Sequence, residues 1–363
     1  MIKRIFLLLL CSNAIGYAQS TLKPIADKTE IYNSLQLASD IQKAYPVDSL
    51  YSLTHYKSLY KSPEVGLTNM WGLYLNDKNN VYEIVIRGSV NKGVSWLANY
   101  YAAMIPSSGE IQLDNQTKRK YNLSPDTRAS VHAGWTIASL YLMEDIQPKL
   151  DSLIKLNKKE FIISGHSQGA AIAYLITANL INQQINGKIP ADIQFKTYAI
   201  APPKPGNLYF SYQYEKLANN WSYSVINIQD WVPELPPTTQ TFRDFNEISP
   251  LADHQVKKAL NKVPWPKRIF AKNILNSIKN PTEKSVKKYN KYLGSFVFEF
   301  IQKQLPELKE PIYSLNSNYA RCSNPIILDG LHDKKYQEQF HKPENIMTHH
   351  LPPAYLYLLE KNK

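Results

Sequence analysis

Four short runs of apolar residues, separated by polar segments, predict the strands of a buried sheet. Each run is rich in β-branched or aromatic side chains, the composition of strands that are covered on both faces. The runs are residues 81–87, 161–163, 195–200 and 223–228. Residues 70–75 precede the first run across a polar turn at 76–80, and we expect them to pair with it as a hairpin.

Helical periodicity fills the intervals between these strands. Residues 133–156 and 170–181 repeat apolar side chains at helical spacing, the second segment almost continuously. We also expect a helical lead-in over residues 19–65, and a long loop over 91–128 with a short helix near 96–101. Strands that alternate with helices are typical of the α/β class, in which a mostly parallel sheet is flanked by helices on both faces.

Residues 251–310 differ from the rest of the chain in charge. Helical patterning continues there, interrupted by three prolines, and thirteen Lys or Arg stand against five Asp or Glu. We interpret residues 245–345 as a basic helical insertion or cap inside one domain that covers 19–363. The basic surplus favours peripheral contact with an anionic membrane, although a solvated helical face would have the same composition. No nucleic-acid-reading motif accompanies it, so no nucleic-acid partner is expected.

The start of the chain predicts export. Of the 363 residues, 1–18 have a basic start, a short apolar run and small residues at the end, the pattern of a cleaved signal peptide. A periplasmic or extracellular location follows. Lipid modification of Cys11 is a less favoured route, because Leu10 occupies a position that requires a small residue. Cleavage would leave Cys322 as the remaining cysteine, so no intramolecular disulfide is expected.

The sharpest chemical signal is the sequence Gly165-His166-Ser167-Gln168-Gly169, between a predicted strand and a predicted helix. This is the setting of a nucleophile elbow, in which a serine stands exposed at a tight strand-to-helix turn. The two glycines remove side chains that would collide where the strand and helix cross. The helix start also directs backbone N–H groups toward a developing oxyanion. We predict that Ser167 is a nucleophile; a helix-capping serine in a plain turn is the alternative.

A serine nucleophile needs a base and an orienting acid, which follow it in the order acid, histidine in folds of this kind. Asp230 comes just after the predicted strand 223–228, at the end where parallel strands deliver side chains to an active crevice. Position alone would suit an ordinary loop aspartate equally well. Among the eight histidines, His349 and His350 come last and remain as candidates for the base.

Four segments of the chain resemble motifs of one enzyme family. The segments are residues 87–89 (RGS), 131–135 (VHAGW), 203–207 (PKPGN) and 227–237 (NIQDWVPELPP). They are similar to elements of the class 3 (fungal-type) lipases of the α/β-hydrolase superfamily. The resemblance covers about residues 65–240 and resumes at the C-terminus, and it implies the α/β-hydrolase fold.

The resemblance also implies roles for individual residues. The family's catalytic acid falls on Asp230, and the backbone N–H groups of Ser89 and Gln168 would form the oxyanion hole, with the Ser89 hydroxyl as a further donor. The family's histidine commonly precedes a tyrosine by five residues, which favours His350 over His349. Two features depart from the family: Gln168 replaces the usual leucine, which would make the rim of the site more polar, and the stretch before the histidine is longer than usual.

These observations predict a secreted serine ester hydrolase that acts on lipid or other acyl esters through an acyl-enzyme. No cofactor is expected, and no metal-ligand spacing is visible. An apolar cluster over 96–105 coincides with the family's lid, although a covered core helix would be equally apolar. The alternatives are a phospholipase A-type enzyme at anionic membranes and a catalytically inactive lipase-like binding protein. The oligomeric state is not predicted.

Overall fold

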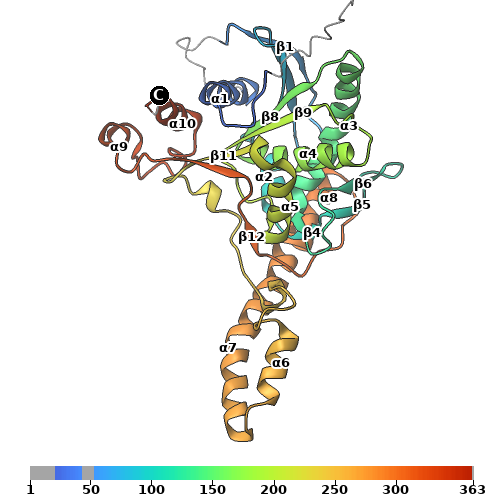
Figure 1. Cartoon of the computed structure of the whole chain (residues 1–363), viewed down its shortest axis with the longest axis vertical. Helices are drawn as coiled ribbons and strands as arrows, with labels where there is room; N and C mark the ends of the chain where they lie inside the picture. Colours follow the sequence, from blue (N-terminus) through green and yellow to red (C-terminus); the bar gives the residue numbers. More distant parts are fainter. Residues whose placement is uncertain (1–20, 43–52, 362–363) are drawn as a thin grey trace, which may run out of the picture.

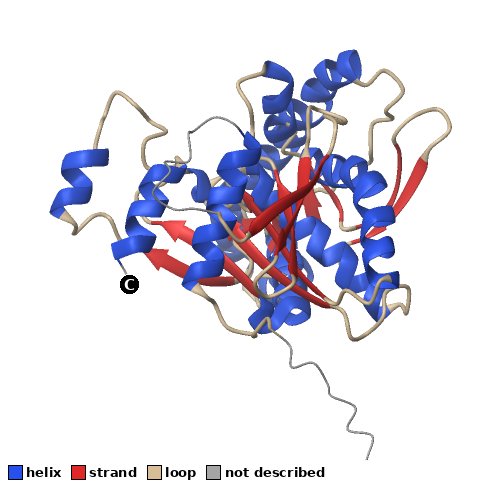
Figure 2. Cartoon of the chain, turned by 90° about the horizontal axis from the view of Figure 1, so that it is seen from above, coloured by secondary structure: helices blue, strands red, loops and turns tan. Residues whose placement is uncertain are grey.

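A seven-stranded sheet forms the centre of the protein (Figures 1 and 2), in the order β1-β2-β3-β8-β9-β11-β13. The computed structural model describes residues 21–42 and 53–361, so the predicted signal peptide, with Cys11, lies outside the described residues. Neighbouring strands from β3 to β13 are parallel, and β2 and β1 extend the sheet antiparallel. The strands are β1 Tyr56–Lys61, β2 Trp71–Asn76, β3 Val81–Ile86, β8 Glu160–His166, β9 Gln194–Ile200, β11 Ser222–Asn227 and β13 Asn324–Leu328.

Helices cover both faces of this sheet. Successive side chains of a strand point to opposite faces, so Phe161 and Ile163 of β8 enter the larger core while Ile162 enters the smaller one. The larger core contains side chains of α3 and α4, and the smaller one contains side chains of α1, α9 and α10. These helices are α1 Lys28–Gln42, α3 Ala133–Lys155, α4 Gln168–Ile185, α9 Lys334–Phe340 and α10 Pro352–Lys361. The predicted mostly parallel α/β sheet flanked by helices is confirmed.

The N-terminal part of the sheet follows the prediction in one place and departs from it in another. The hairpin expected from residues 70–87 is confirmed, since β2 and β3 pair antiparallel. The helical lead-in over 19–65 is wrong beyond α1, because β1 pairs with β2 at the edge of the sheet. None of the six β1 side chains is fully buried. An edge strand of this kind lacks the apolar alternation by which strands are recognised in a sequence.

Two small antiparallel sheets involve the segment that we expected to be a long loop. Some of their strands lie within that segment, and the others come from later parts of the chain. The predicted short helix is α2, Gly93–Tyr100, but strands follow it where only loop was expected. One sheet has the order β12-β10-β7-β4 and the other pairs β5 with β6. The strands are β4 Met104–Pro106, β5 Ser108–Gln112, β6 Lys118–Asn122, β7 Ser130–His132, β10 Gly206–Asn207 and β12 Tyr319–Ala320. They are two to five residues long, too short for a periodic pattern to identify them.

The range 245–345, interpreted as a helical insertion, is helical in its first part and again at α9, with strands between them. Its first helices are α6 Asp253–Asn261, α7 Trp265–Asn290, the π-helical turn η4 Lys291–Phe296 and α8 Val297–Gln304. Strands β12 and β13 follow, and β13 is the last strand of the central sheet. The helical interpretation was too wide because β13 has only five residues and begins Asn-Pro, so its apolar run is brief.

Prolines divide this helical segment at one place only: Pro264 lies in the break between α6 and α7, whereas Pro266 and Pro281 lie within α7. α7 continues through Pro281, which removes the backbone N–H that would bond to the Ser277 carbonyl. Both residues are exposed. The remaining short helices are α5 Leu208–Ala218, η1 Asn219–Trp221, η2 Val232–Glu234 and η3 Phe242–Asp244. Across residues 21–42 and 53–361, no helix has an apolar stretch long enough to span a bilayer.

Candidate active site

The turn between β8 and α4 holds Ser167 in a strained backbone conformation. Ser167 has φ 59° and ψ −128°, a region that residues with a side chain rarely adopt. On either side of it, a Cβ atom at Gly165 would collide with the Gly169 backbone, and one at Gly169 would collide with the Ile86 carbonyl. The sequence therefore forms the predicted elbow because glycine alone permits the close crossing of strand and helix.

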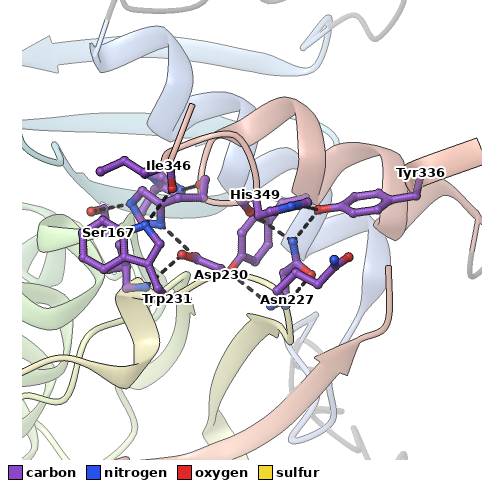
Figure 3. Close-up of polar contacts among 12 residues, drawn as sticks. Ser167, Asn227, Asp230, Trp231, Tyr336, Ile346 and His349 are labelled. Carbon is purple, nitrogen blue, oxygen red and sulfur yellow. Dashed lines mark hydrogen bonds and ion pairs between the residues drawn. The ribbon is translucent and has the colours of Figure 1, made fainter. Parts of the chain in front are cut away.

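Three residues from distant parts of the chain form a continuous hydrogen-bonded array at this turn. The Ser167 hydroxyl donates to Nε2 of His350 over 2.8 Å, and Nδ1–H of His350 donates to Oδ2 of Asp230 over 2.8 Å. Asp230 and His350 are only 3% and 2% exposed, whereas Ser167 is partly open. Figure 3 shows Asp230 in the loop that follows β11, facing Ser167. A base positioned between a hydroxyl and a buried carboxylate can activate that hydroxyl as a nucleophile.

The Asp230 carboxylate is held by two further donors. The phenol of Tyr355 in α10 donates to Oδ2 over 2.8 Å, and the backbone N–H of Val232 donates to Oδ1 over 2.9 Å. Tyr355 is fixed in turn, because its oxygen accepts the backbone N–H of Asn227 over 3.1 Å. These bonds compensate the carboxylate for the loss of water and set its orientation toward His350.

The two neighbouring histidines are occupied elsewhere. Nε2 of His166 donates to the His350 carbonyl over 2.8 Å, and burial, followed by the proximity of His350, lowers the pKa of His166 to about 3. His166 is therefore neutral, and its hydrogen bond helps to hold the His350 backbone in place. The Tyr336 phenol bonds Nδ1 of His349 over 2.8 Å, away from Ser167 (Figure 3). The structure thus brings His350, and not His349, to Ser167.

The two residues expected at the oxyanion hole lie side by side. Gln168 is the first residue of α4 and Ser89 follows β3; the Ser89 hydroxyl donates to Oε1 of Gln168 over 2.8 Å. No hydrogen bond within the described part of the chain uses the backbone N–H of either residue. The Ser89 hydroxyl, which we expected to face an oxyanion, instead donates to Gln168. Gln168 is 2% exposed, so it adds little polar surface to the rim, and its bond to Ser89 joins the start of α4 to the segment that follows β3.

A second ring of polar contacts holds Ser89 in place. Asn99 at the end of α2 donates to the Ser89 hydroxyl over 2.8 Å and accepts Nε1–H of Trp135 over 2.9 Å. The His132 ring bonds the Asn99 carbonyl over 3.1 Å and stacks on Trp135, and burial lowers its pKa to about 3. His132 is thus a neutral structural residue. The positioning role of Asn99 was not predicted, because it depends on contacts between separate segments.

An apolar cavity of about 310 Å³ opens beside Ser167 and His350. Most of its walls are aromatic, aliphatic or proline side chains. The lining residues other than Ser167 and His350 are Trp96, Asn99, Tyr100, Ala102, Trp135, Gln168, Pro203, Trp231, Val232, Leu235, Pro236, Pro237, Tyr289, Leu293 and Met347. Such a cavity can hold an acyl chain with its carbonyl at the serine. Tyr289 and Leu293 come from the basic helical segment, which the sequence did not connect with the site.

The apolar cluster over 96–105 has two different roles. Trp96 and Tyr100 of α2 line the cavity, as a lid segment would. Met104 and Ile105 are completely buried and belong to the core, with Ile105 packed among residues of the larger core. The second half of this cluster is therefore core rather than lid.

Cys322 lies outside this hydrogen-bonded array. Among residues 21–42 and 53–361, no group of His, Cys, Asp and Glu side chains has the geometry to bind a metal ion. Cys322 is 1% exposed, and burial raises the pKa of its thiol. A buried thiol of this kind is unreactive.

Comparisons with known proteins agree with this architecture. Residues 83–240 match the family described as Lipase (class 3). The chain is 25% identical over 227 residues to secreted mono- and diacylglycerol lipase 3 of Gibberella zeae, an alignment that covers 56% of this chain and 70% of that protein. It is 34% identical over 97 residues to secreted mono- and diacylglycerol lipase LIP1 of Malassezia globosa, which covers 26% of this chain and 30% of that protein.

Among solved structures, lipase II from Rhizopus niveus is 20% identical, with 58% of this chain and 77% of that chain covered and a TM-score of 0.42. The strand order and the elbow agree with the sequence match to the lipase family. Over residues 83–240 the chain is similar to the class 3 lipases, and this match supports a carboxylic ester hydrolase.

Proposed function

We propose that this protein is a secreted lipase-like ester hydrolase in which Ser167, His350 and Asp230 form a catalytic triad. The observation that carries the proposal is the unbroken set of hydrogen bonds from Ser167 through His350 to Asp230 beside an apolar cavity. A hydroxyl, an imidazole and a buried carboxylate in this order perform acyl transfer on several unrelated folds.

In this mechanism the Ser167 oxygen attacks the ester carbonyl carbon while His350 accepts its proton. Asp230 keeps the imidazole in the required tautomer and stabilises its positive charge. The backbone N–H groups of Ser89 and Gln168 stabilise the oxyanion, each by about 3 kcal/mol. His350 then protonates the departing alcohol, which leaves an acyl group on Ser167. A water molecule, deprotonated by His350, attacks the acyl-enzyme carbonyl carbon. The bond to the Ser167 oxygen then breaks, His350 returns the proton to that oxygen, and the carboxylic acid is released.

The substrate class follows from the cavity and from the relatives. The walls are predominantly apolar and suit the acyl part of a lipid ester. Relatives from Gibberella and Malassezia are named secreted mono- and diacylglycerol lipases, which supports glycerides as substrates and export of the protein. The pattern of residues 1–18, from which we predict a signal peptide, also supports export.

The test is hydrolysis of p-nitrophenyl esters of graded acyl length by the parent and by Ser167→Ala. We expect the variant to lose at least about 10⁴-fold in kcat, because no other group replaces the nucleophile. Ser277→Ala, at an exposed serine on α7, is the matched control and should keep the parent rate. Equal hydrolysis by the parent and Ser167→Ala would reject the triad.

A phospholipase A-type activity is the second candidate, and the basic segment whose helix also lines the cavity favours it. Release of fatty acid from anionic phospholipid vesicles, compared with release from a diacylglycerol emulsion, separates the two activities. A binding protein without catalysis remains the third reading. It would take first place if the parent cleaved neither p-nitrophenyl esters, glycerides nor phospholipids.

A further inference from the structure

The hairpin of α6 and the first part of α7 projects from the body of the protein (Figure 1). We call residues 253–288 the arm. None of the described side chains of residues 254–276 is buried. Two of them are large and apolar, Trp265 and Phe270, which are 73% and 70% exposed. Large apolar side chains that face water on a projecting element indicate a surface that meets a partner.

One side of α7 carries a row of these side chains. Phe270, Ile274 and Ile278 follow one another at four-residue spacing, which places them on the same side of the helix, and they are 70%, 48% and 55% exposed. Further along the same continuous helix, Tyr292 and Phe296 repeat the spacing and are each 51% exposed. The apolar row therefore extends from the arm toward the body.

Positive charge accompanies this row. At about 100° per residue, Lys267, Lys284 and Lys288 lie on the side of the row or beside it. All three are exposed, and none has a carboxylate within ion-pair distance among the described residues. Over residues 253–290 the sequence has ten Lys or Arg and two Asp or Glu. One of those acids, Glu283, already pairs with Lys279 at 3.7 Å.

We propose that this side of the arm docks on the headgroup layer of an anionic phospholipid bilayer. The lysines would contact lipid phosphates while Phe270, Ile274 and Ile278 enter the interfacial region. Such a bilayer is the one partner that matches both features, because it presents negative charge above an apolar layer. A second copy of a chain with a net charge of +12 would set one basic face against another, and a nucleic acid would leave the apolar row in water.

The docking surface is connected to the cavity through the same helix. α7 continues through η4, and Tyr289 and Leu293 form part of the cavity wall. The Leu293 carbonyl accepts the backbone N–H of Ala103 over 2.9 Å, which joins this helix to the segment that follows α2. Docking would hold one wall of the cavity next to the lipid. This consequence rests on the proposed function, whereas the docking itself does not.

The experiment measures partition of Ser167→Ala protein onto sedimented vesicles, so that hydrolysis does not alter the lipid. Vesicles of phosphatidylcholine are compared with vesicles of phosphatidylcholine and phosphatidylglycerol, at low and high salt. We expect at least about tenfold tighter partition onto the anionic vesicles, and a loss of that preference at high salt. Because no turnover is needed, failure of the proposed hydrolysis leaves this measurement interpretable.

Two triple variants in the same background separate the apolar row from the charge. Phe270→Ser with Ile274→Ser and Ile278→Ser removes the row, and its control changes two equally exposed residues far from the arm, Leu156→Ser with Ile185→Ser. We expect the first variant to weaken anionic partition at least about tenfold, and the control to match its parent.

The charge variant is Lys267→Gln with Lys284→Gln and Lys288→Gln. Its control makes the same change of charge at three exposed lysines elsewhere, Lys120, Lys155 and Lys188. Tenfold weaker anionic partition for the arm variant alone would support docking. The proposal is overturned by equal binding to neutral and anionic vesicles, or by arm variants that bind like their controls. It is also overturned if the apolar variant only converts a dimer to a monomer, or if the charge variant only weakens binding to DNA.

Discussion

At the scale of single residues, the candidate site depends on which nitrogen faces which oxygen. His349 and His350 are adjacent in the chain, yet their side chains meet different partners. His350 lies between Ser167 and Asp230, and His349 bonds to Tyr336. These residues lie in the turn before α10, where adjacent side chains point in different directions, so one position decides whether an imidazole can accept the serine proton.

Replacing each histidine in turn tests this geometry. For His350→Ala we expect kcat on a p-nitrophenyl ester to fall by about 10⁴-fold or more, because the general base is lost. For His349→Ala the fall should stay within about tenfold, since only a supporting bond to Tyr336 disappears. Steady-state kinetics with thermal melting as a folding control measure both. Comparable losses in the two variants would contradict the assignment of His350.

At the scale of elements, the central sheet contains a buried acid on β3, the strand that pairs with β8 before the elbow. Glu83 of β3 is 1% exposed, and its Oε1 accepts the hydroxyl of Ser164, which lies on β8 three residues before Ser167. Burial raises the pKa of Glu83 to about 7, partly offset by the hydrogen bond from Ser164, and the charge of Glu30 adds to the rise. The strand pair beneath the nucleophile therefore contains a group that is neutral in mildly acidic solution.

This acid makes stability depend on pH. The folded-state pKa of about 7 lies above the ordinary value of 4.5, so the folded protein holds the proton more tightly. Below pH 4.5 Glu83 is protonated in both states and does not lower the free energy of unfolding. As pH rises, its ionisation lowers that free energy, by about 3 kcal/mol in full above about pH 7. Glu83→Gln removes this cost.

The free energy of unfolding, measured with urea for parent and variant below pH 4.5 and above pH 7, checks the prediction. The variant should gain about 3 kcal/mol relative to the parent between the two conditions. A difference between the two proteins that does not change with pH would show that Glu83 titrates normally.

At the scale of the whole molecule, the arm is separable from the folded body. Of the residues in α7, only Val286 near its base is buried, so the distal hairpin adds little to any core. The part of the helix that serves the cavity begins at Tyr289. Folding and the candidate site therefore depend on the base of α7, and the projecting part is free to serve another purpose.

Replacing residues 253–276 by a short Gly/Ser linker should leave the body folded. We expect the free energy of unfolding to change by less than about 1 kcal/mol and kcat on a soluble ester to stay within about twofold, because no described side chain of 254–276 is buried. In contrast, Val286→Ala at the base should cost about 2 kcal/mol, since it leaves a small cavity. Urea unfolding and ester kinetics measure both variants. Loss of cooperative unfolding on arm removal would show that the hairpin supports the core.

Short-range sequence patterns predicted much of the fold and part of the candidate site. Strands β2, β3, β8, β9 and β11 are apolar runs or form a hairpin, and the elbow needs two glycines at fixed spacing around Ser167. Each of these features depends on a few consecutive residues, so the sequence alone determined them. The edge strand β1 and the short strands β4 to β6 have no comparable pattern. They are extended because other strands pair with them.

Tertiary structure decided everything that joins distant segments. His350 lies 183 residues after Ser167 in the chain. Whether it or His349 faces Ser167 depends on how α10, which follows both, packs beside β11. The bonds of Asn99 to Ser89 and Trp135, and the contribution of Leu293 to the cavity, likewise need separate elements to meet. The sequence by itself determined the chemistry available and the local turn that exposes it. The three-dimensional packing determined which groups touch, because contacts across the chain are set by the shapes of whole elements rather than by neighbouring residues.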